Sequence, residues 1–252
     1  MQNPVQGKRV LITGAGRGLG AAYAVILADM GAELTLAARK PEALEKVAAV
    51  IRDRTGTAPE TVPLDLADIA AVTQLADRRC AEARPLDILI NNGATWLAGP
   101  MESAPPEKIA ALITANVTGT LLLTRGLLPL LRKSPAADIV NLVSVTGMTH
   151  VPLQTASIAM AASKYGQAGF TDGLRQELRG TRIRITALYP PYLKDLSPLD
   201  AEAWNAPRDA KSWVDNRDMV EATVWALARA RHVSFMSVML ESDTSNFHFH
   251  TA

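Results

Sequence analysis

Short apolar runs alternate with longer amphipathic stretches along the chain, and this rhythm constrains the fold more than any other feature. The first pair is "RVLITG" followed by "GLGAAYAVILADMG"; the second half adds "DIVNLVS", "RIRITALYP", "SFMSVML" and helical stretches over about 161–179 and 218–229. Repeated strand-then-helix order requires parallel strands joined by right-handed crossovers. We therefore predict one α/β domain over residues 1–252. It is a doubly wound parallel sheet of about seven strands with helices on both faces.

Two stretches depart from this alternation. One is a proline-rich stretch late in the chain, and the other is a long helical segment near the middle of the chain. Residues from about 190 to 217 are proline-rich, which predicts a loop that covers a substrate. The segment over about 107–131 is predicted to be one helix. No uninterrupted apolar run approaches the roughly 20 residues needed to span a bilayer, so no membrane partner is expected.

The amino-acid composition limits which classes of function the protein can have. Of the 252 residues 48% are hydrophobic, and 26 Lys and Arg against 25 Asp and Glu give a net charge of +1. This balance offers no electrostatic attraction to nucleic acid, so the expected partner is a small-molecule substrate. A lone cysteine, Cys80, and an N-terminal segment without a long apolar core indicate a cytoplasmic protein.

Two weaker patterns favour ordinary surface roles. His248 and His250 in "FHFH" lack a third ligand, which favours a tail, and no metal site is predicted. Arg179, Arg182 and Arg184 form a basic cluster that we interpret as solvated.

The stretch "TGAGRGLG", from Thr13 to Gly20, stands between the first apolar run and the first amphipathic stretch. Gly14 permits a tight turn, Gly18 lets the backbone approach a pyrophosphate, and Gly20 allows close packing of the helix. The helix N-terminus would supply amide donors to an anion. A purely structural glycine turn is the alternative, but the position at the first strand-to-helix junction favours a dinucleotide site.

The end of the second apolar run, "LTLAARK", bears on which dinucleotide binds. Where an acidic residue would hold the ribose of NAD, the chain has Ala38 and Arg39, and Arg17 lies in the glycine turn. Two guanidiniums suit a 2'-phosphate, so NADP(H) is predicted, although either arginine can instead be a solvated surface charge. Asp65 is placed to accept a hydrogen bond from the adenine amino group. Its alternative role, shared with Asp68, is to cap the next helix.

Further motifs complete a pattern that covers nearly the whole chain: "NNGA" at 91–94, "NVTG" at 116–119 and "VSVTG" around Ser144. With these, the sequence resembles the classical short-chain dehydrogenase/reductase family. The resemblance implies a Rossmann-type fold, NAD(P) binding, hydride transfer to or from a carbonyl or alcohol, and a homo-oligomer, either a dimer or a tetramer. It assigns catalytic positions to Asn116, Ser144 and Lys164, and cofactor positions to Leu19, Leu66, Asn91, Gly93, Lys164 and Pro190.

The chain departs from the family at the proton donor. Met160 stands where the family carries a tyrosine, four residues before Lys164, and no Tyr-x-x-x-Lys occurs anywhere. A thioether cannot donate a proton, and general acid catalysis typically contributes about 10²–10⁴-fold. His150 is the first candidate for a substitute donor. After the sixth strand, Asp195 replaces the threonine that holds the nicotinamide amide in the family, while Tyr189 and Tyr192 are more typical of pocket walls.

Reduction of an iminium ion would not need the missing proton donor, because an iminium carbon accepts a hydride without needing a proton in the same step. A soft thioether at position 160 suits such a cation. The predicted function is therefore an NADP(H)-dependent reductase that transfers hydride to a carbonyl or imine carbon of a small molecule. Two alternatives remain open: a non-redox cyclase, dehydratase or isomerase on the same scaffold, and a catalytically silent NADP-binding protein.

Overall fold

Seven parallel strands form the central sheet of the computed structural model, which describes residues 3–151, 153, 156–208 and 213–242. The strand order is β3-β2-β1-β4-β5-β6-β7, so the direction of winding reverses between β1 and β4. This confirms the predicted doubly wound sheet. The strands are β1 (Arg9–Thr13), β2 (Glu33–Ala38), β3 (Glu60–Pro63), β4 (Ile88–Asn91), β5 (Asp138–Leu142), β6 (Arg184–Tyr189) and β7 (Ser237–Met239).

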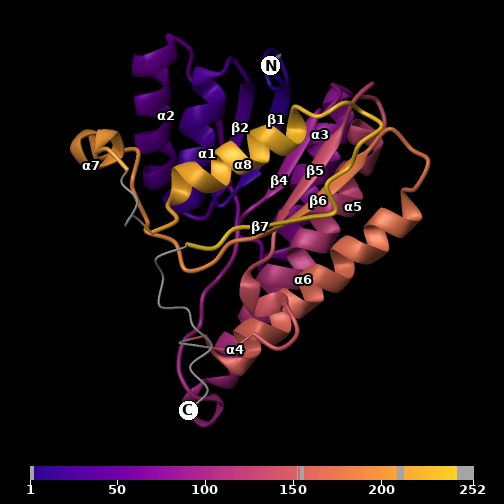
Figure 1. The fold of residues 1–252 in the computed structure, drawn as a ribbon. Helices are drawn as coiled ribbons and strands as arrows, with labels where there is room; N and C mark the ends of the chain where they lie inside the picture. Colours follow the sequence, from indigo (N-terminus) through magenta and orange to yellow (C-terminus); the bar gives the residue numbers. More distant parts are fainter. Residues whose placement is uncertain (1–2, 152, 154–155, 209–212, 243–252) are drawn as a thin grey trace.

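Helices cover both faces of the sheet (Figure 1). On one face lie α1 (Gly18–Asp29), α2 (Pro41–Thr55) and α8 (Asn216–Leu227). On the other lie α3 (Ile69–Glu82), α5 (Thr120–Leu131) and α6 (Ile158–Glu177). The shorter elements are α4 (Pro106–Ile113), α7 (Ala201–Asn205), the 3-10 turns η1 (Met101–Ser103) and η3 (Val145–Gly147), and the π-helical turn η2 (Thr114–Gly119).

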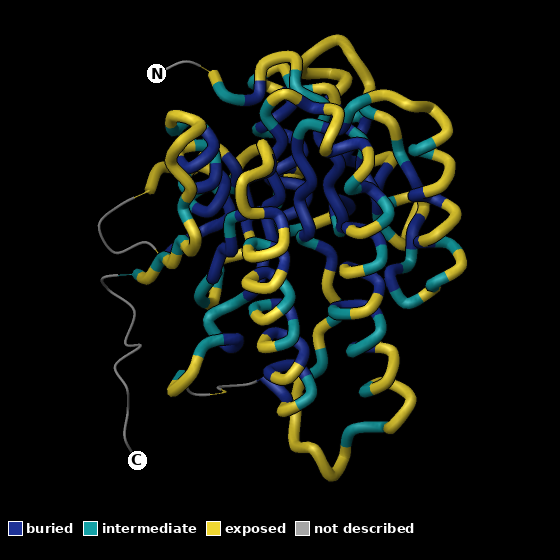
Figure 2. The backbone as a smooth tube through the Cα atoms, turned by 90° about the vertical axis from the view of Figure 1, so that its right-hand side faces the viewer, coloured by how far each residue is buried: buried dark blue, intermediate teal, exposed yellow. Residues whose placement is uncertain are grey.

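The sheet is buried because both of its faces pack against helices. Every residue of β4 and β5 is buried, as expected for central strands of a parallel sheet. Figure 2 shows the same buried band through the middle of the molecule, with exposed backbone at its periphery. The carboxyl ends of β1 to β4 consequently meet at one rigid edge, where open α/β sheets place their ligands.

Element boundaries shift by a few residues from the sequence predictions. The predicted helices 161–179 and 218–229 are observed as Ile158–Glu177 and Asn216–Leu227, and the last strand is reduced to Ser237–Met239. The helix start moves because Ser157 caps α6, its Oγ accepting from Met160 N at 3.1 Å. Within the predicted 190–217 loop the short helix α7 forms, while residues 209–212 lie outside the described part.

The helix predicted over about 107–131 is observed as the continuous helical run Pro106–Leu131, which passes through the π-helical turn η2. The run has 26 residues and contains an 18-residue window of mean hydropathy 1.3, so by length and composition alone it could cross a membrane, but 44% of that window is buried inside the structure. Its buried side chains, such as Leu123 and Leu127, pack in the core between the sheet and α3.

Candidate active site

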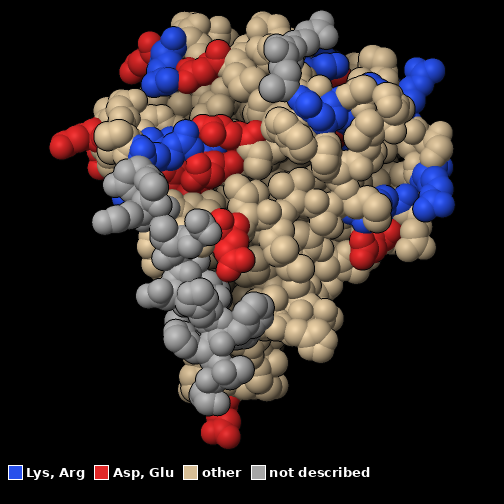
Figure 3. All heavy atoms as spheres, in the orientation of Figure 1, with Lys and Arg blue, Asp and Glu red and all other residues tan. Residues whose placement is uncertain are grey.

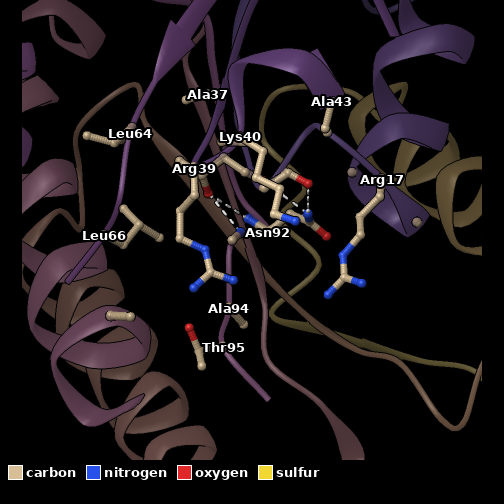
Figure 4. A pocket seen from close by; sticks show the side chains of 18 of the residues that line it. Arg17, Ala37, Arg39, Lys40, Ala43, Leu64, Leu66, Asn92, Ala94 and Thr95 are labelled. Carbon is tan, nitrogen blue, oxygen red and sulfur yellow. Dashed lines mark hydrogen bonds between the residues drawn. The ribbon is translucent and has the colours of Figure 1, made fainter. Parts of the chain in front are cut away.

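A cavity of about 560 Å³ opens at the carboxyl ends of β1 to β4, where the winding of the sheet reverses. Its walls come from the glycine turn before α1, the ends of β2 and β3, the segment after β4, and Asp195 (Figure 4). Of the predicted cofactor residues, nine line this cavity: Gly14, Arg17, Gly18, Leu19, Gly20, Arg39, Asp65, Leu66 and Gly93.

The glycine turn has no room for a side chain at Gly14 or Gly20. A Cβ on Gly14 would lie 2.7 Å from the Cα of Gly93, and one on Gly20 would lie 2.1 Å from the Gly14 carbonyl oxygen. Gly18 has a φ of +56°, a left-handed conformation that other residues adopt at a cost. The first turn of α1 has neither a side-chain cap nor an acidic residue. Since Gly18, Leu19 and Gly20 of this turn line the cavity, a helix N-terminus is placed where it can bind an anion such as a pyrophosphate.

The segment after β4 is fixed against this turn by hydrogen bonds. Asn92 Nδ2 donates to the carbonyl oxygen of Thr13 at 3.0 Å, and Gly93 N donates to Thr13 Oγ1 at 2.9 Å. Asn92 lines the cavity, whereas its neighbour Asn91 does not. Asn91 is 3% exposed and donates to Thr124 and Asn141, because the strand alternation turns its side chain into the core. Of the two adjacent asparagines, the predicted cofactor residue Asn91 is therefore buried behind the cavity wall, and Asn92 lines the cavity.

Three cationic side chains line the cavity beside the glycine turn and the end of β2. Arg17 and Arg39 lie on either side of Lys40 and Asn92 (Figure 4), and all three cations are exposed. Among the described residues none of them has an acidic partner. Guanidinium and ammonium groups in this arrangement can bind a phosphate through charge-assisted hydrogen bonds. Lys40 was missed from sequence, although its position directly after Arg39 was the available signal.

Two carboxylates also line the cavity. Asp65 Oδ1 accepts from the amide of Ala67 at 2.9 Å, while Asp68 caps α3 by accepting from Ala71 N at 3.0 Å. The capping role therefore falls to Asp68. Asp195 Oδ1 accepts from Asn216 Nδ2 at 2.8 Å and lies 3.2 Å from where a Gly18 Cβ would be. This places a hydrogen-bond acceptor directly above the glycine turn.

The predicted catalytic lysine lies in a buried cluster beside the cavity. Lys164 Nζ donates to the Leu142 carbonyl oxygen at 3.0 Å and to Gln167 Oε1 at 2.7 Å. Gln167 Nε2 in turn donates to the Asn116 carbonyl oxygen at 2.8 Å. Burial disfavours the charged ammonium and lowers the pKa of Lys164 to about 7. Near neutral pH this amine can therefore both lose and accept a proton.

Asn116 connects the buried cluster to the cavity. It lies in the π-helical turn η2, and its Oδ1 accepts from Thr95 N at 2.7 Å. Its Nδ2 donates to the Thr95 carbonyl oxygen at 3.0 Å and to Ser163 Oγ at 3.1 Å. Since Thr95 lines the cavity, one amide side chain links the cavity wall to the helix that carries Lys164. Such π-helical turns are frequent at functional sites.

Met160 belongs to this cluster but not to the cavity wall. It is 3% exposed and packs against Leu112 and Ala156, with its Sδ 3.8 Å from Asn116 Nδ2. The thioether of Met160 is thus directed into a small apolar cluster of the core. Gln167 was missed from sequence; its spacing of three residues from Lys164 on α6 was the available signal.

The remaining predicted residues lie outside the cavity wall and outside the buried cluster around Lys164. Ser144 Oγ hydrogen-bonds to Thr146 Oγ1 at 3.0 Å in the loop after β5, and Pro190 accepts from Val145 N at 3.1 Å without lining the cavity. His150 is exposed, with a left-handed φ of 64°. The structure thus brings Asn116, Met160 and Lys164 together and leaves His150 on the surface. No cluster of three metal-ligating side chains occurs in the described ranges, and His248 and His250 lie outside them.

The fold and this cavity define a doubly wound α/β protein with a dinucleotide-sized site at its switch point. The profile of the short chain dehydrogenase family matches residues 8–206. An uncharacterized oxidoreductase from Staphylococcus saprophyticus is 29% identical over 235 residues, covering 93% of this chain and 97% of that protein. A dehydrogenase/reductase SDR family protein 7-like from Drosophila melanogaster is 33% identical over 203 residues, covering 79% of this chain and 61% of that protein.

Solved structures agree with this assignment. A short chain dehydrogenase from Shigella flexneri, complexed with NADP, superposes with a TM-score of 0.80 at 28% identity, covering 95% of this chain and 99% of that one. One from Escherichia coli, complexed with NADPH, gives the same TM-score and identity over 95% of this chain and 98% of that one. The chain belongs to the short-chain dehydrogenase/reductase family, which confirms the resemblance in the sequence.

Proposed function

We propose that the protein is an NADP(H)-dependent oxidoreductase that transfers hydride to a carbonyl or imine carbon of a small molecule without a tyrosine proton donor. The observation that carries this proposal is the group of three exposed cations, Arg17, Arg39 and Lys40, that line the cavity beside the glycine turn and the end of β2. A 2'-phosphate is the part of NADP that distinguishes it from NAD, and such cations recognise it. The NADP and NADPH complexes of the Shigella and Escherichia relatives support the same choice.

The nicotinamide cofactor, when bound, supplies the hydride; this chain's residues bind it and control the proton. The glycine turn and the α1 amides would hold the pyrophosphate, and Asp65 would accept from the adenine amino group. The Asp195 carboxylate, fixed by Asn216, would accept from an amide N–H donor such as the nicotinamide carboxamide. Lys164 is the one buried amine in the described cluster whose pKa is suited to exchanging a proton near pH 7.

Reduction of an imine is the second candidate, and the surroundings of Met160 favour it. Met160 replaces the phenol with a thioether packed between Leu112 and Ala156, so the cluster has no hydroxyl acid at that position. An iminium ion already carries its proton, and hydride addition alone yields the amine. A ketone needs a proton as well, and the loss of general acid catalysis slows such a reaction by about 10²–10⁴-fold.

Turnover tests the chemistry directly. Wild-type protein is incubated with NADPH and matched pairs of a cyclic ketone and the corresponding cyclic imine, and the nicotinamide absorbance is followed. We expect consumption of NADPH, faster with the imine than with the ketone. Faster ketone reduction would overturn the imine preference, and tight NADPH binding without consumption by either class would favour the silent binding protein. Product formation without a change in absorbance would favour the non-redox alternative.

Cofactor choice is tested by binding. The Arg17→Ala/Arg39→Ala variant should bind NADPH at least about 100-fold more weakly than wild type, because it loses two charge-assisted hydrogen bonds that contribute about 1.5–3 kcal/mol each. NADH, which lacks the 2'-phosphate, should bind the two proteins within about twofold of each other. Arg78→Ala/Arg132→Ala removes the same charge from two exposed arginines elsewhere and serves as the control. An equal loss for NADPH and NADH would contradict the assignment of these arginines.

We further propose a cytoplasmic location and assembly into a homo-oligomer, a dimer or a tetramer, which the family resemblance and the composition support.

A further inference from the structure

A second cavity, of about 590 Å³, lies at the opposite edge of the sheet from the dinucleotide site. It is formed around the amino end of β6, the C-terminal end of α6 and the segment after α8. Five arginines line it, namely Arg175, Arg179, Arg182, Arg184 and Arg231, together with His232, and no acidic residue of the described part of the chain does. In Figure 3 Lys and Arg side chains gather at the right-hand edge, where Figure 1 shows the end of α6.

The cavity wall is held in place by a buried ionic clamp. Asp138 at the start of β5 accepts from Arg184 Nε at 2.7 Å and from Arg231 at 2.6 Å. Arg184 is 7% exposed and also donates to the carbonyl oxygens of Leu227 and Val233. These bonds fasten the segment after α8 to the sheet. Because they neutralise one carboxylate and fix two arginines, the cavity is preformed rather than assembled by a ligand.

Two of the remaining arginines, Arg179 and Arg182, are available to a ligand. Arg179 and Arg182 are exposed and have no side-chain hydrogen bond or ion pair within the part of the chain that the structure describes, and His232 is exposed beside them. Arg175 is paired with Asp172, an exposed carboxylate, at 2.6 Å. The walls therefore carry a clear excess of positive charge in a protein whose total net charge is only +1.

Apolar side chains complete the lining. Leu178 and Ile183 are buried beneath the arginines, and the exposed Met236 lies at the rim. Planar guanidinium groups match the geometry of phosphate oxygens, while an apolar floor suits the organic part of a phosphate ester. A concave cavity of this size also fits a small molecule rather than a polymer.

We propose that this cavity is a second ligand site, distinct from the dinucleotide site, and that it binds a phosphorylated small organic molecule through Arg179 and Arg182. Of the basic cluster that the sequence analysis interpreted as solvated, Arg184 is instead buried and paired with Asp138, while the exposed Arg179 and Arg182 form the anion-binding wall of the cavity. The proposal does not depend on the chemistry at the other edge of the sheet.

The test uses phenyl phosphate, inorganic phosphate and phenol as probes, titrated calorimetrically into the full-length Arg17→Ala/Arg39→Ala protein. That background removes the two arginines of the other cavity. We expect phenyl phosphate to bind more tightly than inorganic phosphate, phenol not to bind, and added Arg179→Ala/Arg182→Ala substitutions to weaken phenyl phosphate at least tenfold. Hydrogen exchange should show protection at about residues 178–184 and 231–236 when phenyl phosphate is bound.

A charge-matched control separates a site from a general effect of net charge. Adding Arg78→Ala/Arg132→Ala to the same background should leave phenyl phosphate affinity within about twofold, since these exposed arginines lie on α3 and after α5. Equal losses in the two variants, protection elsewhere in the chain, or no binding of phenyl phosphate at millimolar concentration would each overturn the proposal.

Discussion

At the scale of single residues, the most unusual group in this protein is a lysine inside the core. Lys164 is 4% exposed, and its partners are a carbonyl oxygen and the Gln167 side chain. No carboxylate among the described residues is paired with it. A buried charge without a counter-ion is unfavourable, so the amine loses its proton more readily than in water. The sequence placed this lysine on the right helix but gave no measure of its burial.

The pH dependence of stability should reveal this group. The pKa of Lys164 falls from 10.5 to about 7 on folding, so between these values the unfolded chain binds the proton and the folded one does not. The free-energy cost of burying the charged Lys164 ammonium in the folded protein is fully present below about pH 7 and disappears as the pH rises toward 10.5. The stability of wild type relative to Lys164→Met should therefore increase over this range, by a few kcal/mol.

Denaturant unfolding of both proteins at several pH values measures this difference, because other titrating groups contribute equally to each. Gln167→Leu, which removes the Oε1 partner of Lys164, should move this pH-dependent rise in stability to lower pH. A stability difference that does not change between pH 7 and pH 10 would contradict the buried, uncompensated amine.

At the scale of elements, some glycines are required because a side chain would collide with the backbone beside the cavity. Others lie in helices without such a contact. Gly20 lies in the first turn of α1, and a Cβ there would be 2.1 Å from the Gly14 carbonyl oxygen, whereas a Cβ on Gly173 in α6 would have nothing within 4 Å. The glycine motif in the sequence singled out Gly20 for close packing of the helix, and the structure shows the contact that requires it.

Two alanine substitutions test this contrast. Gly20→Ala should destabilise the protein by about 1–3 kcal/mol and abolish dinucleotide binding, because the turn must move away to avoid the methyl group. Gly173→Ala should stabilise it by about 0.5–1 kcal/mol through helix propensity and leave binding unchanged. Chemical denaturation and a cofactor titration provide both readouts. Similar effects from the two substitutions would show that the close contact at Gly20 is absent in solution.

At the scale of the whole molecule, two apolar clusters share one sheet. One joins α1, α2 and α8 to the strands, and the other joins α3, α5 and α6 to the opposite face. Because adjacent residues of the same strands belong to different clusters, neither half of the core can form without the sheet. This arrangement supports the prediction of a single domain over the whole chain.

Unfolding should accordingly be one cooperative transition. Tryptophan fluorescence is weighted toward the cluster of α1 and α8, because Trp204 is 8% exposed and packs in it, while circular dichroism reports helices on both faces. The two probes should give coincident denaturation curves. A fluorescence transition that precedes the loss of helical signal would instead indicate two separately unfolding units.

The sequence by itself determined the layered α/β architecture, the glycine turn and the cations beside it. These features are local: apolar periodicity fixes the type of element, and ligand-binding residues follow directly after strands whose ends must meet in a parallel sheet. For the same reason the sequence alone assigns Arg17, Arg39 and Asp65 to one edge of the sheet, and all three line the cavity.

Only the tertiary structure decided which of two adjacent asparagines faces the cavity, that Met160 points into the core, and that Gln167 joins Lys164 to Asn116. It also decided that scattered arginines from α6, β6 and the segment after α8 surround one cavity. Each of these depends on packing between residues far apart in the chain. Side-chain direction and burial are set by those neighbours, and a single sequence carries no local signal for them.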